Sequence, residues 1–269
     1  MKRIAYLLAA AALLALPSCR FVRISDELRQ QIKEDINLDL EVNGEDVTIG
    51  KGSITASNNY ITRNDMTGEF HSIECNVPGD VIYTPGDCAI SFDGPDNVLQ
   101  HIKVNNENGT LVVKTDGISI RNLKKFTVRL SSPVLEDLDF NGAIDFSAPQ
   151  GITALDFSLT VNGAGDVDIA GLKADKADIT VNGAGDVDVN KLDCERIAVA
   201  VNGAGDVDVD RLDCERISVV VNGAGDANLA GRAAKAELSI SGAGDIDASN
   251  LQCSEIDSKV HGLGRIRKP

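Results

Sequence analysis

The sequence contains no tryptophan, and aromatic residues make up only 4% of its 269 positions. No aromatic residue occurs between residue 161 and the C-terminus. Sugar-binding surfaces use aromatic rings as apolar platforms with a polar handle. The C-terminal part of the chain therefore lacks the side chains for such a platform.

Basic residues are also scarce, since 26 Lys and Arg against 41 Asp and Glu give a formal charge of −15. Nucleic-acid binding needs a basic face, so this class of partner is excluded. The three histidines, His71, His101 and His261, stand beside no acid that breaks the repeat described below. Arg196 and Arg216 occupy the same position in successive repeats, whereas a catalytic residue should occur only once in the chain. We expect no enzymatic activity, and a polysaccharide-active enzyme is the third alternative.

Residues 1–18 have the features of a bacterial lipoprotein signal peptide. Lys2 and Arg3 precede an apolar run of 13 residues, Ile4–Leu16, which is short for a membrane span. The run ends in "LPSC", where Cys19 follows a small residue as in a lipobox. We predict that Cys19 carries the lipid and anchors the chain to the membrane. Cleavage would bring the formal charge to −17.

From residue 140 onward the chain repeats itself. Residues 181–200 and 201–220 differ at four of twenty positions, and the blocks recur at intervals of 19 to 21 residues. Their apolar residues alternate with polar ones, as in Val187 and Val189, which is a strand pattern. Each block holds three short apolar pieces. A fixed period of this length predicts a solenoid. We therefore expect an all-β fold, a right-handed parallel β-helix with coils of about 20 residues.

Stacked coils place equivalent residues in columns along the solenoid. We expect a leucine column pointing inward, and beside it a column in which alanine alternates with cysteine as a small buried residue. The leucine column comprises Leu172, Leu192, Leu212 and Leu251. The second column comprises Ala174, Cys194, Cys214, Ala234 and Cys253.

The cluster N-G-A-G-D at the head of each block predicts a corner of the coil. Gly163 and Gly165, with their equivalents one period on, are expected where the backbone needs a positive φ. Asparagines at the corner would stack as a ladder, amide on amide. The ladder would comprise Asn162, Asn182, Asn202 and Asn222.

Two columns of aspartates follow each corner, and they allow two interpretations. Their carboxylates form either a solvated acidic face that discourages edge-to-edge stacking, or oxygen ligands for Ca²⁺. The chain differs from the nonapeptide calcium repeat in its period and in the missing double glycine. The candidate metal ligands are Asp166, Asp168, Asp186, Asp188, Asp206 and Asp208. We expect no other cofactor.

The remaining cysteines leave their bonding open. Export permits disulfides, and Cys75 and Cys88 could close one around the turn-rich segment between them. Cys194 and Cys214 would have a suitable Cα separation, but neighbouring parallel strands constrain the dihedral angle of a bridge. We expect free buried thiols at that pair.

Before the regular coils the pattern loosens. Residues 19–67 are expected to form a tether or irregular segment, in which Ser25–Ile36 could be a short helix. Residues 68–139 are rich in strands with Gly, Pro and Asp turns. Residues 140–269 form the regular coils, and Arg265, Arg267 and Lys268 are expected to close their C-terminal end.

Four motifs before the coils, together with the coils themselves, carry a resemblance to a known family. They are "FHSI" at Phe70, "GDV" at Gly79, "GTLVV" at Gly109 and "VRLSSPVL" at Val128, followed by the G-x-G-D coils. In this order they resemble the Bacteroidetes family described as "putative auto-transporter adhesin, head GIN domain". The resemblance covers roughly residues 68–260. It implies an exported β-helix with a more irregular N-terminal half, and it transfers no catalytic residue.

Together these features predict an adhesin-like lipoprotein of the cell envelope, anchored in the outer membrane by its N-terminal lipid. It would present an extended acidic surface to a protein or glycan partner. The alternative is a structural or envelope-stress component without a ligand. The sequence leaves open whether the protein faces the periplasm or the cell surface.

Overall fold

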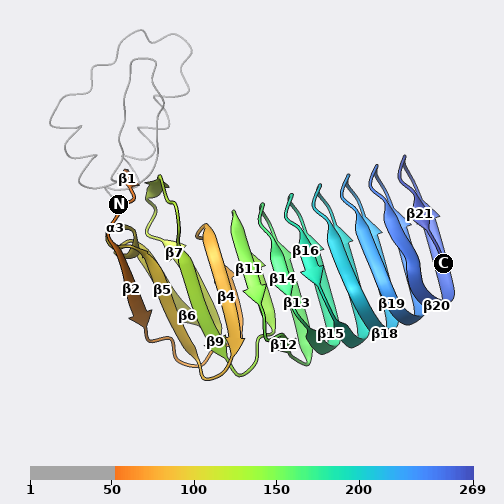
Figure 1. Cartoon of the computed structure of the whole chain (residues 1–269), viewed down its shortest axis with the longest axis horizontal. Coiled ribbons are helices and arrows are strands. Elements are labelled where there is room, and N and C mark those ends of the chain that lie inside the picture. The colour runs from red at the N-terminus through yellow and green to blue at the C-terminus, as the bar shows by residue number, and fades with distance from the viewer. Residues whose placement is uncertain (1–51) are drawn as a thin grey trace, which may run out of the picture. The chain divides into compact units, whose positions relative to one another are not determined.

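The computed structural model describes residues 52–269, of which Ser53–Pro269 form one compact unit. This part of the chain is all-β, a parallel β-solenoid of stacked coils of about 20 residues (Figure 1). Its single helix within this range is one turn, α3 (Asp96–Leu99). The fold class expected from the repeat is confirmed.

Every strand pairing of the regular coils is parallel, one coil upon the next, and the register is unbroken except for one shift in the pairing of β18 with β19 and one in that of β19 with β20. Val187 pairs with Val207, for example, and Leu192 with Leu212. The strands are β10 (Asp137–Phe140), β11 (Ile144–Ala148), β12 (Ile152–Thr153), β13 (Asp156–Val161), β14 (Val167–Ile169), β15 (Leu172–Val181), β16 (Val187–Val189), β17 (Leu192–Val201), β18 (Val207–Val221), β19 (Ala227–Ile240), β20 (Ile246–Val260) and β21 (Ile266–Arg267).

The expected three strands per coil are partly fused. In β17 the second and third apolar pieces form one strand of ten residues, and in β18 all three pieces form one strand of 15 residues. The bend within β17 lies where Glu195 and Arg196 both point outward between inward Cys194 and Ile197. Two consecutive outward residues break the period-two alternation, so the strand turns a corner while its hydrogen bonding continues.

The N-terminal half is irregular, as expected, because it mixes antiparallel and parallel pairs. Antiparallel pairs join β2 to β5, β5 to β9 and β6 to β7. A separate small sheet pairs β1 with β8. These strands are β1 (Ser53–Thr55), β2 (Tyr60–Asp65), β3 (Ser72–Cys75), β4 (Gly79–Pro85), β5 (Ala89–Pro95), β6 (Ile102–Glu107), β7 (Thr110–Thr115), β8 (Ser119–Arg121) and β9 (Thr127–Ser132).

The coil order of this half differs from the chain order. Strands β3 and β4 lie between β7 and β9 on one side and β10 and β11 on the other. The chain therefore builds the layer of β3 and β4 before the layer of β7 and β9 that stacks on it, and then passes to the layer of β10 and β11 on the other side. Figure 1 shows β4 beside β11 accordingly.

The core changes character along the solenoid. Large aromatic side chains fill the N-terminal half and the first coil: between ring centroids, Phe92 stacks on Phe126 at 6.1 Å, and Phe140 of β10 lies 5.3 Å from Phe146 of β11. Beyond Phe157 the interior consists of Val, Leu, Ile, Ala and Cys. The leucine column is buried at Leu172, Leu192, Leu212 and Leu251, which confirms that prediction.

Candidate functional site

The coil corner carries the asparagine ladder that the sequence predicts. Each asparagine side-chain N–H donates to the Oδ1 of the asparagine one coil before it, at donor–acceptor distances of 2.8–3.0 Å. The ladder begins one coil earlier than expected, at Asn141, and Asn162 also donates to Asp139. The signal was available, since "FNGAID" at Phe140 already contains the corner pattern in weaker form.

The corner glycines are required for a different reason from the one expected. Gly163 and Gly165 do not have a positive φ, and among the corner glycines only Gly142 in the first corner and Gly262 in the last corner do. Instead, a Cβ at any interior corner glycine would lie 1.8–2.4 Å from a backbone oxygen of the preceding coil. Glycine is therefore needed because neighbouring coils approach too closely for a side chain.

The first aspartate column is part of this corner. The backbone N–H of Asp206 donates to Oδ1 of Asp186 at 2.9 Å, and the N–H of Asp226 donates to Oδ1 of Asp206 at 2.7 Å. The same bond starts at Asp145 and ends with the N–H of Arg265. A carboxylate that accepts a backbone N–H satisfies a group that the turn leaves without a backbone partner. This role was not predicted from the sequence.

The second column, which we call the acidic column, comprises Asp168, Asp188 and Asp208. The three residues pair in register on β14, β16 and β18 and alternate with buried valines and Ile169, so their carboxylates face solvent. Burial raises the pKa of Asp188, and the carboxylates of Asp208 and Asp168 raise it further. The three charges repel one another along the solenoid.

Both the column and its charge change toward the C-terminus. Asn228 takes the next position and donates to Asp208 at 2.6 Å. Asp247 follows, and the Arg267 guanidinium donates to it at 3.0 Å. Hydrogen bonds from Ser249, together with Arg267, lower the pKa of Asp247 to about 2. The fold thus places a neutral residue or an ion pair at these two positions, and three adjacent carboxylates in the acidic column.

The calcium hypothesis has little geometric support. Within residues 52–269, no group of three or more His, Cys, Asp or Glu side chains is arranged to hold a metal ion. One oxygen of Asp186 and one of Asp206 are already engaged by backbone amides. Binding of Ca²⁺ by the aspartate columns stays a prediction.

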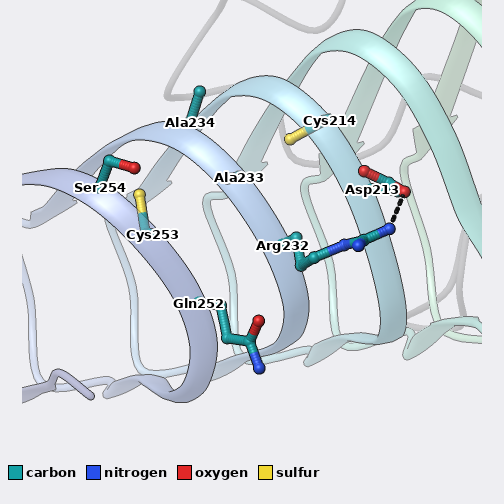
Figure 2. Close-up of a pocket in the computed structure, with 8 residues that line it drawn as sticks. All are labelled: Asp213, Cys214, Arg232, Ala233, Ala234, Gln252, Cys253 and Ser254. Atoms are coloured by element: carbon teal, nitrogen blue, oxygen red, sulfur yellow. Dashed lines mark hydrogen bonds and ion pairs between the residues drawn. The ribbon is translucent and has the colours of Figure 1, made fainter.

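The column of small residues is largely as expected, with one correction. Cys194 pairs with Cys214, but the next coil presents Ala233 rather than Ala234, and Cys253 follows. Ala234 points outward and lines a shallow groove together with Cys214 and Cys253 (Figure 2). The Cys214 thiol shares a hydrogen bond with Cys194, which lowers the pKa of Cys194 and raises that of Cys214.

Cys75 and Cys88 are free thiols in the structure. Cys75 is buried, which raises its pKa to about 11, and its Sγ donates to the Val77 carbonyl at 3.6 Å. The Cys88 Sγ donates to the Phe70 carbonyl at 3.7 Å. The structure does not join the two sulfurs, and their pairing in an oxidising compartment stays a prediction.

The histidines of the N-terminal half pair with acids. His71 lies 3.1 Å from Glu136 and His101 lies 3.2 Å from Asp116, and all four side chains are partly exposed. The aromatic rings of the described residues are buried apart from Tyr60, which is 44% exposed. This half therefore offers one exposed ring and no aromatic platform among residues 52–269.

The predicted signal peptide at residues 1–18 and the predicted lipidation of Cys19 lie outside the described residues. The expected helix at Ser25–Ile36 lies outside them as well. Among residues 52–269, no helix has the length and apolar character needed to cross a membrane.

Comparison with known proteins agrees with this architecture. The family model described as "putative auto-transporter adhesin, head GIN domain" matches residues 69–190 and again 177–267. The fold and its corner define a parallel β-solenoid with coils of about 20 residues. This chain belongs to the "putative auto-transporter adhesin, head GIN domain" family, as its motifs indicated.

Solved structures give the same result. A "putative adhesin" from Bacteroides fragilis is 25% identical, with a TM-score of 0.75 over 81% of this chain and 100% of its own. A "putative lipid binding protein" from Parabacteroides distasonis (16% identity, TM-score 0.67, 81% and 99% coverage) shares the fold. So does a "putative adhesin" from Parabacteroides merdae (16%, 0.58, 81% and 99%). The search of curated proteins gives no match.

Proposed function

We propose that this protein is an adhesin-like module of the cell envelope that binds a basic protein surface through its acidic column. Its family is described as an adhesin, which is a non-enzymatic role. The similar protein from Bacteroides fragilis is described as a "putative adhesin". The rigid stack of coils would present the column without a large entropic cost on binding.

One observation carries the proposal: the acidic column keeps its charge repulsion although the fold has the means to remove it. Asn228 and the Arg267–Asp247 pair interrupt the run of unpaired carboxylates further along the solenoid. Within residues 52–269 no cationic side chain pairs with the acidic column, and its last member accepts a hydrogen bond from neutral Asn228 alone. A cationic partner would relieve the repulsion on binding and would be steered toward it.

A protein partner fits this surface better than a glycan. Residues 161–269 contain no aromatic side chain, and the aromatic rings of residues 70–157 are buried. Glycan recognition by ring stacking therefore has no surface on the coils. Basic side chains of a protein would instead meet carboxylates spaced one strand apart, about 4.8 Å.

The experiment is capture from a solubilised native envelope on the immobilised full chain. The test variant replaces Asp168, Asp188 and Asp208 by Asn, which is the residue that the fold uses at position 228. The control variant replaces the outward Lys176, Arg196 and Arg216 by Gln, which changes three charges in register on the neighbouring face. We expect the Asn variant to lose a partner that the wild type and control retain, in a salt-dependent manner.

Capture of the same proteins by all three chains would contradict a role for the acidic column. Capture of nothing specific by any of them would favour the structural alternative. Anchoring is tested separately: the variant Cys19→Ala should move the protein from the membrane fraction to the soluble fraction. Protease treatment of intact cells then separates the two orientations, because only a surface-facing protein is cleaved.

A further inference from the structure

We propose that Cys194 and Cys214 form a two-coordinate site for a soft monovalent cation, Cu(I). The two residues pair in register on β17 and β18, in adjacent coils. Their side chains project from the same column of the solenoid, and both are free thiols. Soft thiolate ligands select Cu(I), Zn²⁺ and iron–sulfur clusters.

The geometry that disfavours a disulfide at this pair suits a bridging ion. Adjacent parallel strands lie about 4.8 Å apart, and paired side chains extend from them side by side. A direct sulfur–sulfur bond needs the two Cβ atoms closer, at about 3.8 Å, and a dihedral angle near 90°. An ion between the two sulfurs instead needs them to stay apart and to face each other across one strand spacing.

The site is accessible although it belongs to the interior column. Cys194 and Cys214 are 8% and 9% exposed, whereas neighbouring inward residues such as Leu192 and Val199 are at most 2% exposed. The difference arises because the pair lies at the bend of the strand. A groove also opens beside Cys214, because Ala233 takes the next position in the column and has no sulfur to fill it (Figure 2).

The number of ligands selects the ion. Zn²⁺ prefers four ligands in a tetrahedron, and within residues 52–269 no group of three candidate ligands exists. Cys253 lies two coils from Cys214, about 10 Å along the column, and so is too far to share the ion. Binding forms two Cu–S bonds and releases two thiol protons to solvent, with no change in oxidation state.

The test is titration of the reduced full chain with Cu(I) held by the chelator bicinchoninate under anaerobic conditions. We expect one Cu(I) per chain and two sulfur ligands in X-ray absorption at the copper edge. The variants Cys194→Ala and Cys214→Ala should each weaken binding about 100-fold or more, because even outer-shell partners of a metal are worth about 10- to 100-fold.

The column itself supplies the controls. Alanine occupies it at Ala174 and Ala233, so both test variants keep residues that the fold accepts at this place, and thermal melting checks that they fold. Cys253→Ala removes a thiol from the same column and should leave Cu(I) binding unchanged. Equal affinity in Cys194→Ala and wild type, loss of binding in Cys253→Ala, or a Cys194–Cys214 disulfide in the purified chain would each overturn the proposal.

Discussion

The N-terminal half and the regular coils bury their interiors by opposite means. The N-terminal half packs large rings such as Phe92 and Phe126 against one another, and its strands run in both directions. The coils repeat small aliphatic residues in columns, with parallel pairing throughout. In the first region specificity comes from shape complementarity, and in the second it comes from the fixed period that keeps equivalent residues in register.

The two regions also differ in the positions at which they tolerate substitutions. In the coils an interior position accepts more than one size of residue, since Ile197 and Ile217 share their column with Ala177 and Ala236. What the coils do not accept is a change at the corner, where backbone meets backbone. In the N-terminal half the interior positions are the sensitive ones, because no repeat supplies equivalents that could replace its large rings.

The largest expected effect is at the corner. We predict that Gly203→Ala destabilises the protein by about 4 kcal/mol or more, because its Cβ would lie 1.9 Å from the Gly183 carbonyl oxygen. Gly171→Ala is the matched control, since its Cβ would meet nothing within 4 Å and its φ is not positive. Urea unfolding measures both. Equal stability of the two variants would disprove the close-approach explanation.

The second prediction compares the two interiors directly. Phe92→Ala should cost about 3–5 kcal/mol, because Phe92 is fully buried and its loss leaves a cavity beside Phe126 and the overlying Arg63. Ile217→Ala should cost about 2 kcal/mol, the low end for such a change, because Ala236 already occupies its column. Denaturant unfolding of both variants checks the order. A larger loss at Ile217 would contradict the tolerance inferred for the coils.

The third prediction concerns charge in the coils. Asp188→Asn should stabilise the protein at pH 7 by up to about 1 kcal/mol, a Coulomb estimate that solvent screening reduces. The pKa of Asp188 is raised in the folded state. The folded chain therefore binds this proton more tightly than the unfolded chain, and its stability falls as pH rises through the raised pKa. The variant removes that loss, so its advantage should vanish below the ordinary aspartate pKa of 3.8.

Asp247→Asn gives the opposite sign in the same column. The pKa of Asp247 is lowered to about 2, so its stabilising effect is present above 3.8 and is lost as pH falls toward 2. This variant should be less stable than wild type at pH 7. Urea unfolding at pH 7 and at acidic pH, with and without high salt, measures both variants. The same sign for both would rule out the distinction drawn between the two ends of the column.

The sequence predicts the features of the structure that depend on the period of the repeat, but not those that depend on contacts between neighbouring coils. The asparagine ladder and the leucine column follow from the period alone, so they could be predicted residue by residue. Ala233 occupies the column position predicted for Ala234 because the coil beginning at Val221 is one residue shorter than the coil before it. The structure places this deletion opposite the residues between Val209 and Leu212, ahead of the cysteine column, and so shifts every later position of that coil by one residue.

The contacts between neighbouring coils could not be predicted from the sequence. A glycine-rich corner is compatible both with positive φ and with close approach, and only the 1.8–2.4 Å separations decide. Likewise, aspartates of both columns look alike in sequence. One carboxylate accepts an amide of the next coil and the other faces solvent, because they fall on opposite sides of the point where the short strand begins.

The smallest expected effect tests the calcium hypothesis for the aspartate columns. If Ca²⁺ binds the folded chain alone, a concentration equal to its dissociation constant adds about 0.4 kcal/mol to stability. For weak sites of about 10⁻⁴–10⁻³ M, millimolar Ca²⁺ should then raise the melting temperature measurably. The Asn variant of Asp168, Asp188 and Asp208 should lose this rise, and Mg²⁺ at equal ionic strength controls for screening. If Ca²⁺ does not raise the melting temperature of the wild type, the calcium hypothesis is wrong, and binding of a protein partner remains the proposed role of the acidic column.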